Sequence, residues 1–140
     1  MATKKHSPIL VIDDDQNILS IVKAILCDAD YTVLTANSGK AAIALLEQDA
    51  FSLIFLDYMM PVMDGPQCMQ YFRQHDLLHG TPVVLFTADG YIAEKTLAMG
   101  VQDHIKKPFE IDDLLHMVEK WSGTSLLDAS LPEDVQQCDT

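Results

Sequence analysis

The side chains best suited to chemistry in this chain are three acids, a threonine and a lysine, each placed where an apolar run ends. Asp13 and Asp14 follow the first such run, and Asp57 follows the third. Thr87 and Lys107 follow the fourth and the fifth. Carboxylates held close together repel one another unless they are protonated or bridged by a cation. Hard oxygen ligands with room for water suit Mg²⁺, or Mn²⁺ in its place.

The same five residues could carry out phosphoryl chemistry. Asp57 is a possible nucleophile that would form an acyl phosphate. Thr87 could donate a hydrogen bond to one phosphoryl oxygen, and Lys107 could bind another as a point charge. Phosphoryl transfer mainly needs positioning and charge stabilisation, which a bound cation would add.

The elements that must position these residues alternate between strand and helix. Continuous apolar runs predict strands that are buried on both faces, which indicates a parallel sheet between two helix layers. Right-handed crossovers place the carboxyl ends of such strands on one edge, so the five side chains should converge there. The expected strands cover residues 9–12, 31–36, 51–56, 82–86 and 102–106, and the expected helices cover 18–29, 40–48, 64–77, 91–99 and 111–121.

The register of the three consecutive acids decides which of them belong to the site. The first apolar run fills its strand up to Ile12, so Asp13 and Asp14 lie at the strand end. Asp15 then falls at the start of a helix, where an acid caps free N–H groups and favours the helix dipole. We therefore expect Asp13 and Asp14 to be the site pair.

Composition narrows the classes of partner. The formal net charge of −12 argues against nucleic acid or an anionic membrane as the main partner, because both attract basic surfaces. No stretch approaches the ~20 apolar residues of a membrane-spanning helix. Cys27, Cys68 and Cys138 are scattered and form no C-x-x-C pair, which fits a reducing cytoplasm.

Four motifs in order make the chain similar to a known family. They are ILVIDDD (9–15), LIFLDYMMPVMDG (53–65), VVLFTA (83–88) and IKKPF (105–109). With these motifs the chain resembles the receiver domains of two-component response regulators, which are CheY-like in size and layout. The resemblance covers about residues 8–121 and implies a flavodoxin-like α/β fold with strand order 2-1-3-4-5.

The resemblance also implies a role for each matching residue. Asp57 matches the phospho-acceptor, Asp14 the direct metal ligand, and Asp13 an acid acting partly through water. The backbone carbonyl of Met59 matches a further metal ligand. Thr87 and Lys107 match the switch hydroxyl and the phosphate-binding lysine, and the Lys107–Pro108 bond is expected to be cis.

Three positions depart from the commoner family pattern. His104 stands where the family usually has Tyr or Phe, so we expect it to serve with Thr87 as the switch. Met59 and Asp89 occupy the two positions whose side chains, in the family, face the water that attacks the phosphoryl group. An apolar Met59 gives that water no hydrogen bond, so slow hydrolysis is expected.

The function implied is a stand-alone receiver in a phosphorelay. A sensor histidine kinase or a histidine phosphotransfer protein would donate the phosphoryl group, and output would run through protein contacts near His104 and Lys95. The domain would catalyse only its own phosphorylation and hydrolysis. One rival is a pseudo-receiver that binds proteins without being phosphorylated. The other, an Asp-based phosphatase, would need a D-x-D motif that Asp57-Tyr58-Met59 lacks.

The remaining sequence features carry structural expectations. We expect an N-terminal extension over 1–7, the receiver domain over 8–121 and a flexible acidic tail over 122–140. His75 and His79 are four residues apart, but no further ligand pattern supports a metal site there. The methionines of the 59–65 loop are expected to pack beneath it.

Overall fold

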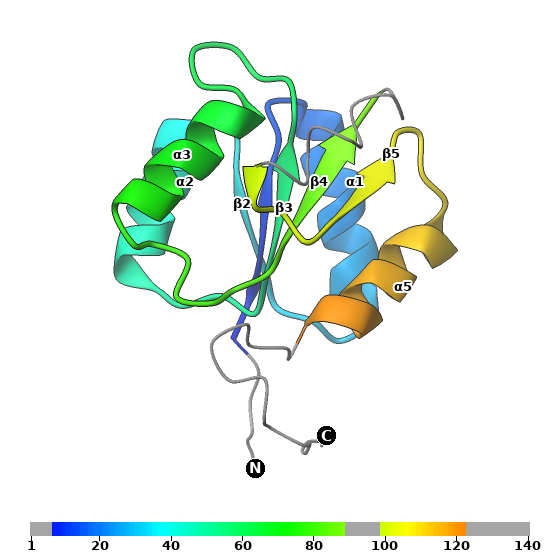
Figure 1. Cartoon of the computed structure of the whole chain (residues 1–140). Coiled ribbons are helices and arrows are strands. Elements are labelled where there is room, and N and C mark those ends of the chain that lie inside the picture. Colours follow the sequence, from blue (N-terminus) through cyan, green and yellow to red (C-terminus); the bar gives the residue numbers. More distant parts are fainter. Residues whose placement is uncertain (1–6, 89–98, 123–140) are drawn as a thin grey trace.

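The protein was analysed as a computed structural model, which describes residues 7–88 and 99–122. Within these residues a five-stranded parallel sheet has the order β2-β1-β3-β4-β5, as the resemblance implied (Figure 1). The strands are β1 (Ile9–Ile12), β2 (Val33–Ala36), β3 (Leu53–Asp57), β4 (Val83–Thr87) and β5 (Asp103–Lys106). The helices are α1 (Gln16–Asp28), α2 (Gly39–Gln48), α3 (Gly65–Gln74) and α5 (Ile111–Trp121).

Two apolar layers hold the helices to the sheet. On one face α2 and α3 pack against the sheet through residues such as Leu46 and Phe72. On the other face α1 and α5 do so through residues such as Leu26 and Val118. β1, β3 and β4 are buried along their whole lengths, as the continuous apolar runs predicted. The predicted three-layer α/β architecture is therefore confirmed.

Side-chain caps fix where three helices begin. Asp15 accepts a hydrogen bond from the Asn17 N–H at the start of α1. Ser38 accepts one from Ala41 at the start of α2. Asp64 forms a capping box with Gln67 at the start of α3. Each cap satisfies N–H groups that the helix itself leaves free.

Two predicted boundaries were wrong for one shared reason. The strand expected from residue 31 begins at Val33, and the helix expected to reach residue 77 ends at Gln74. Asp30 and Asp76 both adopt left-handed backbone, with φ of 73° and 54°, directly after α1 and α3. The following N–H then bonds five residues back, which is the Schellman ending of a helix.

Other differences are local. Asp57 and Thr87 are the last residues of their strands instead of the first residues beyond them. Ile111 was expected on the packed face of α5 but is exposed. His75 and His79 do not share a helix face, because α3 ends before both. The helix expected over 91–99, except for Met99, and the expected 122–140 tail, except for Ser122, lie outside the described residues.

Candidate phosphoryl and metal site

Asp13 and Asp14 lie next to each other at the end of β1 but in different surroundings. Asp13 is fully buried, and its Oδ1 accepts a hydrogen bond of 2.9 Å from the Asp15 N–H. Asp14 is exposed. Carboxylate oxygens of Asp13, Asp14 and Asp57 all lie within 4.8 Å of one another. The structure thus brings together the three acids that the sequence selected.

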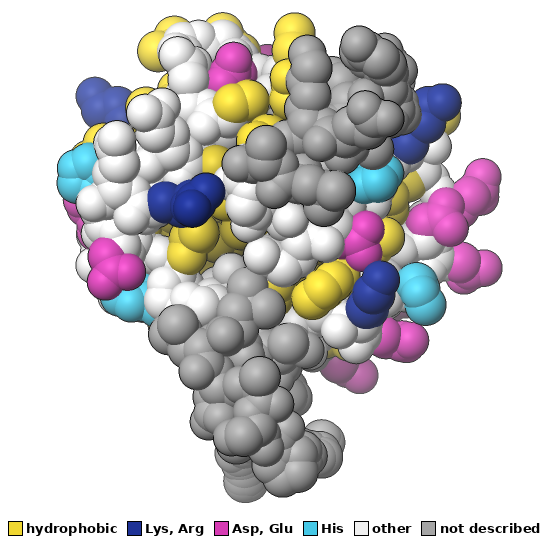
Figure 2. Space-filling view, in the orientation of Figure 1, with side chains coloured by type: hydrophobic (Ala, Val, Ile, Leu, Met, Phe, Trp, Pro, Cys, Tyr) yellow, Lys and Arg dark blue, Asp and Glu magenta, His cyan; other side chains and the backbone are white. Residues whose placement is uncertain are grey.

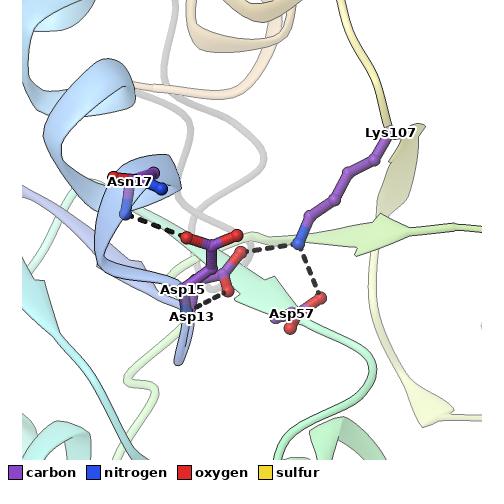
Figure 3. A network of polar contacts seen from close by, with 5 residues as sticks. All are labelled: Asp13, Asp15, Asn17, Asp57 and Lys107. Carbon is purple, nitrogen blue, oxygen red and sulfur yellow. Dashed lines mark hydrogen bonds and ion pairs between the residues drawn. The ribbon is translucent and has the colours of Figure 1, made fainter.

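Lys107 reaches into this cluster from the end of β5. Its Nζ donates to Asp13 Oδ2 at 2.7 Å and to Asp57 Oδ1 at 3.2 Å (Figure 3). Burial would lower the pKa of Lys107, but its hydrogen bond to Asp13 and the two negative charges raise it above its usual value. The ammonium therefore stays charged and offsets one of the three carboxylates.

Asp57 is the most perturbed acid of the cluster. Asp57 is only 7% exposed. Burial, followed by the negative charge of Asp13, raises its pKa from 3.8 to about 6, although Lys107 acts in the opposite direction. Because burial and a neighbouring negative charge both disfavour its ionised form, a cation bound nearby would stabilise the Asp57 carboxylate.

Thr87 closes the site from β4. The residue is fully buried, and its Oγ1 has no hydrogen-bond partner in the described part of the chain. Buried hydroxyls are almost always paired, because a missing partner costs about 1–3 kcal/mol. An unpaired hydroxyl at this strand end is free to bond an incoming oxygen.

The loop between β3 and α3 approaches the acceptor closely. The Gly65 N–H donates to the Tyr58 carbonyl at 2.9 Å, and a Cβ at Gly65 would lie 2.9 Å from the carbonyl oxygen of Asp57. Met59 is 65% exposed. The expectation that the loop methionines pack beneath it was therefore wrong for Met59, although Met60 is buried and Met63 is partly buried.

The expected switch and output residues are only partly described. His104 lies on β5 and is partly buried, opposite Leu85 of β4. Lys106 is exposed, as expected. Asp89 and Lys95 lie outside the described residues.

One feature around Lys107 was missed by sequence reasoning. The rings of Phe86 and Phe109 stack at 5.2 Å between centroids, and the Lys107 Nζ lies 5.7 Å from the Phe86 ring centre. The Lys107–Pro108 peptide bond is cis, as expected. The signal was present, since Phe109 directly follows the Lys-Pro step, but its role depends on a contact between β4 and the segment that joins β5 to α5.

Comparison with known proteins decides the family. Residues 9–119 match the model of the response regulator receiver domain. The chain belongs to the response regulator receiver family. This confirms the resemblance drawn from the four motifs and makes the chain a receiver domain of two-component signalling.

Individual relatives agree with this assignment. The transcriptional regulatory protein CpxR of Klebsiella pneumoniae is 37% identical over 109 residues, covering 76% of this chain and 45% of CpxR. The sensor histidine kinase GacS of Pseudomonas protegens is 34% identical, covering 84% of this chain and 13% of GacS. The receiver domain thus spans less than half the length of these relatives.

Solved structures show the same fold. The receiver domain of NtrX from Brucella abortus is 33% identical, with a TM-score of 0.75 over 84% of this chain and 99% of that one. The chemotaxis protein CheY4 of Vibrio cholerae is 28% identical, with a TM-score of 0.78 over 84% and 99%. Among the helices that the structure describes in this receiver, none is long and apolar enough to cross a membrane.

Proposed function

We propose that this receiver accepts a phosphoryl group on Asp57 from a histidine kinase or a histidine phosphotransfer protein. The observation that carries the proposal is the contact of one ammonium, that of Lys107, with both Asp13 and Asp57, beside a Thr87 hydroxyl that has no partner among the described residues. An acid, a cation and a free donor at one strand edge form the set that phosphoryl transfer to a carboxylate needs.

The acid cluster fits a divalent cation. Three carboxylates face one ammonium, so negative charge remains in excess within the described site. Asp14 is the best direct ligand, because it is exposed, whereas both oxygens of Asp13 already accept hydrogen bonds. Asp57 and the backbone carbonyl of Met59 would complete the protein ligands. When bound, Mg²⁺ or Mn²⁺ would neutralise charge on the acceptor and on the phosphoryl oxygens.

The transfer step then follows from the residues present. A carboxylate oxygen of Asp57 attacks the phosphorus of a phosphohistidine, the P–N bond breaks, and the released imidazole takes up a proton. Lys107 binds one phosphoryl oxygen in place of Asp57 Oδ1, and the Thr87 hydroxyl donates to another. Hydrolysis of the acyl phosphate by water ends the signal, and no external substrate is turned over.

The signalling context follows from the same reaction. The donor would be a sensor kinase or a phosphotransfer protein, and the receiver would then act in the cytoplasm. Output would run through protein contacts on the face that carries His104. Thr87 and His104 lie on adjacent strands, where movement of the hydroxyl toward the phosphoryl group could reach the β5 surface.

Intact mass after incubation with acetyl phosphate and Mg²⁺ tests the proposal. We expect the addition of one phosphoryl group to wild type, none to Asp57→Asn, and full addition to Asp64→Asn, which keeps a capping side chain at a nearby acid. Lys107→Ala and Thr87→Ala should slow or abolish the addition. Unmodified wild type, or equal modification of Asp57→Asn, would reject the proposal in favour of a non-phosphorylated binding module.

A further inference from the structure

A groove of about 730 Å³ lies between α2 and the loop that joins β3 to α3. Its walls are mainly apolar and include Ile43 and Ala44 from α2, Val62 and Met63 from the loop, and Tyr71 from α3. Figure 2 shows hydrophobic side chains exposed at the top of the molecule, where this loop lies in Figure 1. An exposed apolar concavity of this kind typically marks an interaction site.

Val62 at the edge of the groove combines a strained backbone with a fully exposed side chain. Its side chain is 100% exposed, and its backbone φ is 70°. Left-handed backbone is disfavoured for any non-glycine residue, and a β-branched residue there is an outlier. The strained residue is the centre of a tight turn in which the Met63 N–H donates to the Pro61 carbonyl at 2.7 Å, and this turn leaves the Val62 side chain exposed at the edge of the groove.

The outer face of α2 has a symmetric pattern of charge. Lys40, Ile43, Ala44 and Glu47 fall at helical spacing on one stripe that lines the groove, with the two charged residues exposed at its ends. Lys40 and Glu47 are two turns apart, or about 10.5 Å along the axis. An identical helix laid antiparallel across this stripe would place each lysine opposite a glutamate.

We propose that this face binds a second copy of the same chain through a two-fold contact between antiparallel α2 helices. A two-fold interface must be self-complementary, and this stripe is self-complementary in charge. Lys40 of each copy pairs with Glu47 of the other. The protruding Val62 of each copy enters the groove of the other, beside the small Ala44.

A second copy explains this face better than an unrelated partner. A uniformly basic or acidic partner would meet a like charge at one end of the stripe. A second copy of the stripe that runs antiparallel to the first meets an opposite charge at both ends. The contact is small, so we expect a weak dimer whose population depends on concentration. It does not depend on phosphorylation of Asp57, so it can be tested separately.

Sedimentation velocity of the full chain over a concentration series tests the proposal. Each of Lys40→Glu and Glu47→Lys turns two attractive pairs into two repulsive ones, so each should weaken dimerisation by about tenfold. The double variant restores both pairs with reversed polarity and should dimerise like wild type. Lys23→Glu makes the same charge change at an exposed position on α1 and should have no effect on dimerisation.

The Val62 contact has its own variant. Asn tolerates left-handed backbone better than Val, so Val62→Asn should weaken dimerisation while raising the melting temperature of the monomer. Ile21→Asn, which replaces an exposed apolar residue on α1, should leave dimerisation unchanged. A wild type that stays monomeric at every concentration would overturn the proposal. So would a double charge variant that fails to recover.

Discussion

At the residue scale, Asp13 and Asp14 show how neighbouring identical side chains acquire different roles. Asp13 is buried and bonded on both oxygens, to Lys107 and to the Asp15 N–H. Asp14 has neither contact and is exposed. Loss of the Asp13 charge would leave the partly buried ammonium of Lys107 short of a partner, whereas loss of the Asp14 charge would only relieve repulsion.

Asp57→Asn should stabilise the metal-free protein. The raised pKa of Asp57 means that the native state holds its proton more tightly than the unfolded state does. The free energy of unfolding therefore falls as pH rises from 3.8 to about 6, and at pH 7 the ionised Asp57 destabilises the native state. We expect the variant to gain about 1–2 kcal/mol in free energy of unfolding at pH 7, because the raised pKa already includes the Lys107 attraction and solvent screens part of the remaining cost.

Urea denaturation with and without EDTA across pH 4 to 8 measures this effect. The stability of wild type should decline across the window more steeply than that of Asp57→Asn. The exposed variant Asp49→Asn should follow wild type. Parallel profiles for wild type and Asp57→Asn would show that the Asp57 environment does not disfavour its charge.

Thr87→Val should also stabilise the protein while removing a functional group. Val keeps the shape of Thr but lacks the hydroxyl that has no partner in the described site. Removal of an unsatisfied buried polar group should add about 1 kcal/mol to the free energy of unfolding. Thr87→Ser keeps the hydroxyl and loses a buried methyl, so it should melt below wild type. A destabilised Thr87→Val would mean that the hydroxyl has a partner in solution.

The residue types of the site could be predicted from sequence, but their pairings could not. Strand ends on one edge were enough to bring Asp57, Thr87 and Lys107 together. That Lys107 lies nearer Asp13 than Asp57 depends on its side-chain conformation and on the aromatic pair of Phe86 and Phe109. Such contacts depend on tertiary packing, which spacing along the chain does not encode.

At the element scale, helix beginnings were easier to predict than helix endings. Ser38 and Asp64 are standard capping residues, and both cap. α1 and α3 end through left-handed Asp30 and Asp76, where glycine is the usual residue. Neither position carries a glycine that would have marked these endings, so the start of β2 and the end of α3 were predicted wrongly.

The start of β5 is tied to the end of α5 through Asp103. Its Oδ2 accepts hydrogen bonds from Trp121 Nε1 at 3.0 Å and Lys120 Nζ at 3.1 Å. Burial favours a higher pKa, but hydrogen bonds from Trp121, the His104 N–H and Lys120 hold the pKa of Asp103 below its usual value. Ionised Asp103 is thus a link between two elements of the proposed output face.

Asp103→Ala should loosen the end of α5. We expect a loss of about 1–2 kcal/mol in free energy of unfolding and a change in Trp121 fluorescence. Because the native pKa is lowered, the Asp103 contribution is present at neutral pH and is lost as pH falls below the ordinary range of an aspartate. Asp112→Ala, at an exposed position on the same helix, is the control. Unchanged fluorescence would mean that the Trp121 indole is not held by Asp103.

At the scale of the whole molecule, metal binding should couple to global stability. A ligand that binds only the native state at ten times its Kd adds about 1.4 kcal/mol. We expect Mg²⁺ to raise the melting temperature of wild type and to have little effect on Asp14→Asn, which should melt above wild type without metal. Asp15→Asn keeps a cap on α1 outside the acid cluster and should respond like wild type. Equal responses from all three proteins would remove Asp14 from the metal site.

The position of β1 has a consequence for synthesis on the ribosome. β1 pairs with both β2 and β3, so the first 57 residues contain three adjacent strands together with α1 and α2. This half can begin to fold before β4 has left the exit tunnel, because both strand pairings of β1 lie within it. Asp13, Asp14 and Asp57 would then come together early, while Lys107, their only counter-charge in the described cluster, is added about 50 residues later. The nascent chain therefore passes through a stage in which cellular cations alone can balance these acids.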